Sequence, residues 1–282
     1  MTTLQALIIA IVQGATELFP ISSLGHAVIL PALLHWSINQ DAPSFLPFLV
    51  MLHLGTATAL LAYFWRDWLA LILGVLGLRP APESQAARRL LLLIIIATIP
   101  AVIIGGLFEH RIRLLFASPL ISAAFLVVNG LILLLAQRFK DQAGRGERKP
   151  LSTLSTMDAA VVGVWQCLAF LPGLSRSGAT IVGGFTRRLD AEAAAHFSFL
   201  IATPVILGAT VKEVPKLLHA SVPPGTFQTA ILGAVVAGIV AFLSTAFLMR
   251  YFRDHERWAL NPFAWYCVIA GVASLVLLYA GI

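Results

Sequence analysis

Residues 13–26 read QGATELFPISSLGH, and they interrupt an apolar run that extends from Leu4 to Leu34. The interruption holds a carboxylate, two serines, a glycine and a histidine. Ionisable groups at membrane depth are costly and usually serve function. A second interruption of the same kind reads PGLSRSGAT at residues 172–180. We expect the two stretches to meet and to form one site.

The composition is that of an integral membrane protein. Of the 282 residues, 59% are hydrophobic and 11% are charged, whereas a soluble domain usually carries about 25% charged residues. Cys167 and Cys267 lie in apolar segments and are interpreted as buried hydrophobic residues. The Lys and Arg residues behind the net charge of +6 are spread over several short loops rather than clustered on one folded surface, so no nucleic-acid partner is expected.

Apolar windows of about 20 residues can span a bilayer. Six segments qualify, namely Phe45–Phe64, Leu90–Phe108, Leu114–Ala136, Ala193–Val211, Phe227–Met249 and Pro262–Ile282. Two more, Leu4–His35 and Met157–Phe185, are broken by Pro, Ser and Gly, and each fits two half-length helices that enter and leave on one face. Non-helical backbone at that depth must be buried in protein or line a wet cavity. We predict an all-α polytopic membrane protein with six transmembrane helices and two re-entrant helix pairs.

The loop charges orient this arrangement. Most of the 19 Lys and Arg residues fall on one face, and the other face receives only Arg111, Arg113, Lys212 and Lys216. The positive-inside rule makes the basic face cytoplasmic. Both termini are then expected on the outer side, and the site is expected to open outward.

The two halves of the chain resemble each other. At an offset of 153 residues the polar pattern returns, in the pairs Gln13 and Gln166, Ser22 and Ser175, and Gly25 and Gly178. Each half holds one broken segment and three spans, and an odd number of spans inverts the second half. We predict a single membrane domain, 1–282, with inverted repeats at 1–140 and 157–282 and a cytoplasmic linker at 141–156. Transporters are often built this way, with the site at the repeat interface.

The first interruption carries the strongest candidate residues. Gln13 and Glu17 share a helix face, and an intramembrane acid such as Glu17 points to function. Gln13 is explained about as well by helix–helix hydrogen bonding. Ser23 and His26 lie within reach of each other, which suggests a nucleophile with a proton carrier or two groups facing one ligand. His53, a lone histidine in an apolar span, is interpreted as a core residue, and so is His196.

The second interruption has the features of an anion site. Ser175 is an expected helix N-cap, and the amides at a helix start bind phosphate. Arg176 adds a forked, permanently charged donor, and Thr180 lies on the same helical face. The inferred ligand is a phosphate or pyrophosphate. Glu17 would then hold a divalent cation that bridges the phosphate oxygens, or it would pair directly with Arg176.

Together these patterns resemble the undecaprenyl-pyrophosphate phosphatases of the bacitracin-resistance family. The matching motifs are (Glu/Gln)-x-x-x-Glu at residues 13–17, Pro-x-Ser-Ser-x-Gly-His at 20–26 and Pro-Gly-x-Ser-Arg-Ser-Gly-Ala-Thr at 172–180. The resemblance covers the whole chain. It implies removal of the terminal phosphate of undecaprenyl pyrophosphate in the bacterial inner membrane, which recycles the lipid carrier for the cell wall and gives bacitracin resistance. It also implies Mg²⁺ or Ca²⁺ as cofactor.

The resemblance assigns roles residue by residue. It gives catalytic roles to Glu17, Ser23, His26 and Arg176, and metal binding to Glu17 and Gln13. The expected substrate-binding residues are Ser22, Gly25, Ser175, Ser177, Gly178 and Thr180. The family motif accepts glutamine at the first acidic position, which is Gln13 here. Because this amide is neutral, binding of the cation would depend mainly on Glu17.

Two questions stay open at this level. The first is whether Ser23 or His26 attacks the phosphorus itself or whether one of them activates a water molecule for the attack. The second question is whether the protein instead moves a phosphorylated lipid or anion across the membrane, since midplane half-helices also build transporters. Small residues at Gly105, Gly106 and from Gly233 to Gly238 would permit close helix contacts and are compatible with a homodimer.

Overall fold

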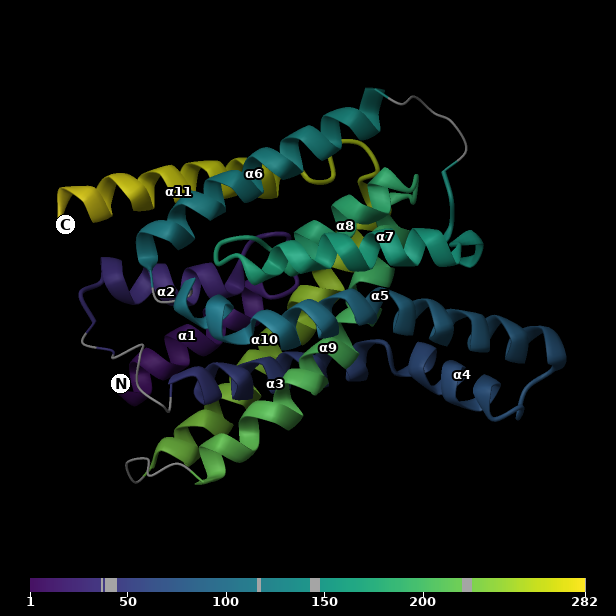
Figure 1. The fold of residues 1–282 in the computed structure, drawn as a ribbon, viewed down its shortest axis with the longest axis horizontal. Helices are drawn as coiled ribbons and strands as arrows, with labels where there is room; N and C mark the ends of the chain where they lie inside the picture. The colour runs from purple at the N-terminus through teal and green to yellow at the C-terminus, as the bar shows by residue number, and fades with distance from the viewer. Residues whose placement is uncertain (37, 39–44, 116–117, 143–147, 220–224, 282) are drawn as a thin grey trace.

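The fold is a bundle of helices of very different lengths (Figure 1). The computed structural model describes residues 1–36, 38, 45–115, 118–142, 148–219 and 225–281. Parts of three predicted segments lie outside these residues: 116–117 in the third span, 143–147 in the linker and residue 282 in the last span.

The first half begins with two short helices, α1 (Thr3–Thr16) and α2 (Ser23–Leu33), as the broken segment predicted. Four helices follow them along the chain, namely α3 (Phe45–Tyr63), α4 (Trp65–Val75), α5 (Ala81–Leu115) and α6 (Pro119–Gln142). The polar turn between α1 and α2 therefore falls inside the apolar run.

The second half also begins with short helices. They are η1 (Leu151–Thr153), α7 (Thr156–Gln166), η2 (Cys167–Phe170) and α8 (Arg176–Thr186). Three long helices then complete the chain, namely α9 (Ala191–His219), α10 (Thr226–Asp254) and α11 (Asn261–Ala280). The second broken segment thus also folds as two half-length helices.

The number of spans agrees with the prediction, although several helices extend beyond the predicted spans; α5, for example, begins at Ala81 rather than at Leu90. In the described part of the chain, five helices are long and apolar enough to cross a membrane, and the number is six when α3 and α4, bent by 73° at their junction, count as one span. The helix α4 was not predicted. The span expected from Leu114 begins instead at Pro119, because Ser118 accepts a hydrogen bond from the Ile121 amide and Pro fits the first helical turn.

Local capping repeats at the offset seen in the sequence. Thr2 and Ser155 both close capping boxes, at the starts of α1 and α7, and Ser22 and Ser175 both cap the second half-helix of their pair. The packing also corresponds, since α1 packs on α10 while α7 packs on α5. These correspondences support the predicted repeat, and its inverted topology stays a prediction.

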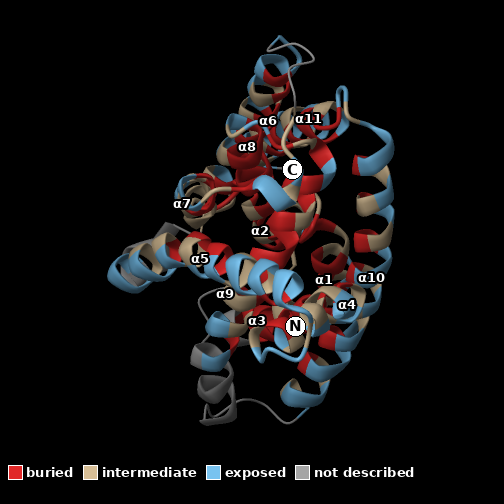
Figure 2. Ribbon diagram, turned by 90° about the vertical axis from the view of Figure 1, so that its right-hand side faces the viewer, coloured by how far each residue is buried: buried red, intermediate tan, exposed pale blue. Residues whose placement is uncertain are grey.

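The short helices occupy the centre, and the long helices surround them. Figure 2 shows buried residues concentrated around α2 and α8 and exposed residues along the outer faces of α5 and α10. Exposed apolar side chains such as Val102, Leu135, Ile239 and Ile269 lie on α5, α6, α10 and α11, which suits contact with lipid. Both termini lie at the same end of the molecule, on the left in Figure 1.

Candidate functional site

The two interruptions meet, as predicted, through hydrogen bonds to backbone. The Phe19 carbonyl accepts from the hydroxyls of Ser177 (2.7 Å) and Ser175 (3.3 Å). Asn129 on α6 joins both turns, because its Nδ2 donates to the Pro20 carbonyl and its Oδ1 accepts from the Ser175 amide, each at 3.0 Å. Asn129 is a structural residue that the sequence did not single out.

Glycines allow the two turns to approach closely. A Cβ at Gly25 would lie 3.1 Å from the Gly173 Cα, and one at Gly178 would lie 3.3 Å from the Pro20 carbonyl oxygen. Gly173 has φ +98°, a conformation that favours glycine, and a Cβ there would collide with the Ser122 carbonyl. Gly25 and Gly178 are therefore packing residues here, and their predicted substrate contacts remain predictions.

Two helix N-termini start at the same place. Ser22 caps α2 by accepting from the Gly25 amide, and Ser175 caps α8 by accepting from the Gly178 amide, each at 3.1 Å. Both serines line one cavity. Helix N-termini carry partial positive charge and bind anions. The pair of starts therefore gives the cavity a backbone contribution that favours phosphate.

Glu17 is the centre of the polar contacts. Its Oε1 accepts from Arg176 Nη2 at 2.9 Å, and its Oε2 accepts from Ser23 Oγ at 2.7 Å and from Gln13 Nε2 at 2.8 Å. Glu17 lies at the end of α1, Ser23 begins α2 and Arg176 begins α8. The structure thus brings these four predicted residues together, and the ion pair of Glu17 and Arg176 joins the two halves of the chain.

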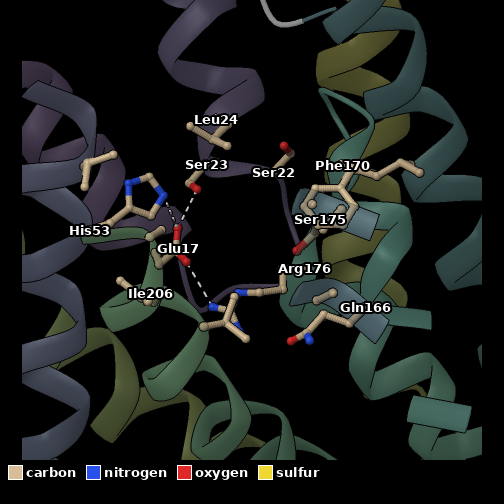
Figure 3. A pocket seen from close by; sticks show the side chains of 18 of the residues that line it. Glu17, Ser22, Ser23, Leu24, His53, Gln166, Phe170, Ser175, Arg176 and Ile206 are labelled. Atoms are coloured by element: carbon tan, nitrogen blue, oxygen red, sulfur yellow. Dashed lines mark hydrogen bonds and ion pairs between the residues drawn. The ribbon is translucent and has the colours of Figure 1, made fainter. Parts of the chain in front are cut away.

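His53 also reaches this carboxylate, although it was expected to be a core residue. Its Nε2 lies 3.4 Å from Glu17 Oε2, and its Nδ1 donates to the Leu49 carbonyl at 2.7 Å. In Figure 3, His53 and Ser23 point to the same carboxylate, and Arg176 approaches it from the other side. No sequence pattern joins α3 to this turn, so only the tertiary fold reveals the contact.

These residues border a cavity of about 580 Å³. Its polar wall includes Glu17, Ser23 and Arg176, and its apolar wall comes largely from α5 and α9, with Gly106 and Gly208 among its lining residues. A cavity of this size holds a small ligand or the head of a larger one. An apolar wall beside a charged end suits an amphipathic molecule.

His26 lies apart from this group. It is not among the described residues that line the cavity. Its Nδ1 donates to the Ser22 carbonyl, and its Nε2 contacts the Tyr266 hydroxyl on α11 at 2.8 Å. The fixed tautomer makes Tyr266 the donor in this contact. His26 thus ties the start of α2 to α11, and its predicted catalytic role stays untested.

Two further predicted residues are engaged in local structure. Ser177 Oγ donates to Phe19, as described above, and Thr180 Oγ1 donates to the Arg176 carbonyl at 2.9 Å and lies 2.6 Å from Ser198 Oγ. Both side chains are buried. Neither belongs to the described cavity lining, so their predicted contacts with substrate remain predictions.

Three buried polar atoms near the site have no hydrogen-bond partner among the described residues. They are Gln13 Oε1, Gln166 Oε1 and Arg176 Nη1. Gln166 lines the cavity and lies beside Arg176 in Figure 3. Buried polar groups usually have partners, so these atoms are candidate ligand contacts. In the sequence, Gln166 is distinguished only by its correspondence to Gln13 in the repeat.

The donor set is compatible with one hard divalent cation. In the described residues, no group of three or more His, Cys, Asp or Glu side chains could hold a metal. Glu17 and the unpartnered Gln13 Oε1 supply oxygen ligands, and Mg²⁺ is often held by one or two carboxylates with substrate phosphates and water. The residues therefore fit a cation that the substrate helps to bind.

The arrangement as a whole suits phosphoryl chemistry. Arg176 and two helix starts favour a phosphate, and the Ser23 hydroxyl donates its proton to a carboxylate, an arrangement that a serine nucleophile would require. Phosphoryl transfer depends mainly on positioning and on electrostatic stabilisation. The geometry provides both within a bundle of apolar helices.

Comparison with known proteins gives the family. The model of the family described as bacitracin resistance protein BacA matches residues 6–273. An undecaprenyl-diphosphatase of Granulibacter bethesdensis is 62% identical over 99% of this chain and 98% of its own length. Another of Acidiphilium cryptum is 60% identical over the full length of both chains, and one of Gluconacetobacter diazotrophicus is 55% identical over 99% and 98%. The chain therefore belongs to the bacitracin-resistance protein BacA family.

Proposed function

We propose that this chain is an undecaprenyl-diphosphatase of the membrane, hydrolysing undecaprenyl diphosphate to undecaprenyl phosphate and inorganic phosphate. The relatives bear this activity in their names. The observation that carries the proposal is the ion pair of Glu17 and Arg176, which joins the two interruptions at a cavity with an apolar wall. The reaction recycles the lipid carrier of envelope synthesis and accounts for the bacitracin resistance of the family.

Arg176 and the start of α8 bind the diphosphate. Arg176 uses Nη2 for Glu17, and its Nη1 has no partner among the residues that the structure describes, so one guanidinium can contact both the carboxylate and a phosphate oxygen. Arginine suits this because its donors form a rigid fork. Charge on the transferring phosphoryl group would be stabilised by this fixed donor, whose side chain is largely buried.

Ser23 is the nucleophile that the geometry favours over His26. Its Oγ lies 2.7 Å from Glu17 Oε2 and donates to it, so the carboxylate can accept the hydroxyl proton. An Oγ–P bond forms while the bond from the terminal phosphorus to the bridging oxygen breaks, and undecaprenyl phosphate leaves. A water then cleaves the phosphoserine, which releases inorganic phosphate and restores the Ser23 hydroxyl.

A divalent cation, Mg²⁺ or Ca²⁺, is part of this proposal. Glu17 and Gln13 would hold it, and it would supply neutralising charge to the phosphate oxygens. Gln13 is buried, and its Nε2 faces the acceptor-only carboxylate, which leaves Oε1 available as a ligand.

The lipid tail leaves the cavity between α5 and α9. The isoprenoid chain is too long for the cavity, and the apolar wall continues towards the outer helix faces. We place the protein in the bacterial inner membrane with both termini and the cavity on the outer side, following the positive-inside rule. The homodimer also remains a prediction. Gly233 and Gly238 pack on α3 of the same chain, so they are not free for a second copy.

Release of phosphate by the purified protein in detergent tests the activity without transport. The wild type should release one inorganic phosphate per undecaprenyl diphosphate, and Ser23→Ala should lower kcat by about 10²-fold or more. Ser244→Ala, a buried serine on α10, is the matched control and should keep activity. Lipid translocation in vesicles without phosphate release in detergent would favour the transporter alternative and refute the proposal.

A further inference from the structure

His53 is held in one tautomer by its own helix. The Nδ1 atom lies 2.7 Å from the Leu49 carbonyl oxygen, which can only accept a hydrogen bond. The proton of the ring is therefore on Nδ1, and the Nε2 lone pair points away from the helix. Histidines that bind metals are commonly oriented in this way, with the second ring nitrogen donating to a carbonyl or carboxylate.

The unprotonated Nε2 faces a hydrogen-bond acceptor rather than a hydrogen-bond donor. It lies 3.4 Å from Glu17 Oε2, an oxygen that already accepts from Ser23 and Gln13. A lone pair and a carboxylate oxygen repel each other unless a positive charge lies between them. That charge is either a second proton on the ring or a bound cation.

A second, independent atom points to the cation. Gln13 Oε1 has no partner among the described residues, and the Gln13 side chain is 1% exposed. The same amide donates to Glu17 Oε2 through Nε2. The His53 ring nitrogen, the Ser23 hydroxyl and the Gln13 amide nitrogen thus contact a single oxygen atom of Glu17, and the unsatisfied Gln13 Oε1 belongs to that same amide group.

We propose that His53 Nε2 is a ligand of the divalent cation, together with Glu17 and Gln13. The proposal rests on the cation of the proposed function and adds a nitrogen ligand to it. Imidazole suits Zn²⁺ and the other later first-row metals, whereas carboxylate, amide and water oxygens suit Mg²⁺, Ca²⁺ and Mn²⁺. A nitrogen ligand strengthens the binding of first-row ions relative to Mg²⁺, and Mn²⁺, which accepts the same oxygen ligands as Mg²⁺, is the probe for it.

Paramagnetic resonance of Mn²⁺ bound to the purified protein in detergent tests this directly. The probe is Mn²⁺ alone, added below the protein concentration, and the signal is the electron spin-echo modulation from a directly bound imidazole ¹⁴N. Growth on ¹⁵N-histidine should replace this modulation with that of ¹⁵N. His53→Gln should remove it and weaken Mn²⁺ binding by about tenfold or more, with a smaller effect on Mg²⁺.

His196→Gln is the matched control. His196 also lies in an apolar helix with its Nε2 3.4 Å from a carboxylate oxygen, that of Asp67, but it is not among the described cavity-lining residues. This variant should keep both the nitrogen modulation and the Mn²⁺ affinity. Proper folding of both variants is checked by their thermal unfolding in detergent.

The outcomes separate the two proposals. Mn²⁺ bound by the wild type with no histidine nitrogen modulation, or with modulation that persists in His53→Gln, overturns the role of His53 and leaves the oxygen-bound cation in place. An absence of Mn²⁺ and Mg²⁺ binding by the wild type, with and without inorganic phosphate, overturns both the cation and its histidine ligand.

Discussion

At the scale of single residues, the site is a balance of charges inside an apolar bundle. Glu17 and Arg176 are both largely buried and lie 2.9 Å apart. Removing one partner of such a pair leaves an uncompensated charge, which is strongly unfavourable. The same pairing holds each group in the orientation that the substrate would meet. Stability and activity are therefore coupled at this contact.

Arg176→Lys should separate charge from geometry. Lysine keeps the charge but has no fork, so it cannot contact Glu17 and a phosphate oxygen in the same way. We expect kcat to fall by about tenfold or more for Arg176→Lys and by about 10²–10³-fold for Arg176→Ala.

Phosphate release at saturating substrate measures the effect. Arg89→Ala is the control, since Arg89 binds the Ser152 and Leu154 carbonyls and is not among the described cavity-lining residues. A wild-type kcat for Arg176→Lys would show that the positive charge alone suffices. It would contradict the requirement for the forked donors of the guanidinium group.

The sequence predicts those site residues whose unfavourable burial can be recognised from their neighbours in the chain. Glu17 and Arg176 stand out because ionisable groups are rare in apolar segments, and Ser23 stands out because it follows a helix break. His53 and Asn129 carry no such mark. Their contacts join segments that are far apart in the chain, and a lone histidine or asparagine in an apolar helix has a sufficient explanation as a core residue.

At the scale of elements, the glycine turn of the second interruption fixes the site. Gly173→Ala should lower stability and activity together, because φ +98° is strained for alanine and the new Cβ would collide with the Ser122 carbonyl. The strained backbone alone is worth about 1–3 kcal/mol. Thermal unfolding in detergent measures the loss. Gly208→Ala is the control, since no atom of the described residues lies within 4 Å of its Cβ position, and an equal loss in both variants would contradict this role of Gly173.

The start of α7 is fixed by a buried carboxylate at the end of the linker. Asp158 accepts from the Ser155 amide at 3.0 Å and from Arg187 Nε at 2.5 Å, and Lys149 Nζ lies 3.5 Å away. Burial alone would raise the pKa of Asp158, but these donors and charges lower it to about 2. The cluster joins the linker, α7 and the segment that follows α8.

This pKa predicts a pH dependence of stability. The unfolded carboxyl titrates near pH 3.9, above the folded value of about 2, so the stabilisation is complete above about pH 4 and is lost as the pH falls towards 2. It amounts to about 2 kcal/mol. Asp158→Asn should therefore unfold at a lower temperature than the wild type at pH 7, and the difference should shrink below pH 4. A difference that stays constant down to pH 2.5 would contradict the assignment.

Element boundaries were predictable where the chain carries its own signals. The half-helices follow from Pro, Ser and Gly in the broken segments. The helix α4 escaped prediction because Trp65–Val75 is short and bends by 73° from the preceding helix. The start of α6 at Pro119 was hidden because apolar residues continue from the end of α5 towards it.

At the scale of the whole molecule, the two halves differ in how closely their corresponding helices pack. Gly55 on α3 packs on Ala234 of α10 so closely that a Cβ would collide with the backbone. At the repeat offset, Gly208 on α9 has open space instead and lines the cavity, as does Gly106 on α5. The opening between α5 and α9 is the side on which we place the lipid tail.

Filling this opening should discriminate between substrates by tail length. Gly208→Leu puts an apolar side chain into the open space at this position, on the proposed tail path. We expect kcat/KM for undecaprenyl diphosphate to fall by about tenfold, or about 1.4 kcal/mol, with a smaller loss for farnesyl diphosphate. Gly106→Ala is the control with a minimal side chain. Equal losses for both substrates would place the tail elsewhere.

The central claim is that two interruptions, far apart in the sequence, make one catalytic site. A double-mutant cycle on kcat/KM with Glu17→Gln, Arg176→Ala and the double variant tests it most directly, since residues that act as a unit give non-additive losses. We expect the double variant to lose about as much activity as the more impaired single variant. Losses that multiply would show that Glu17 and Arg176 act independently and would contradict a shared site.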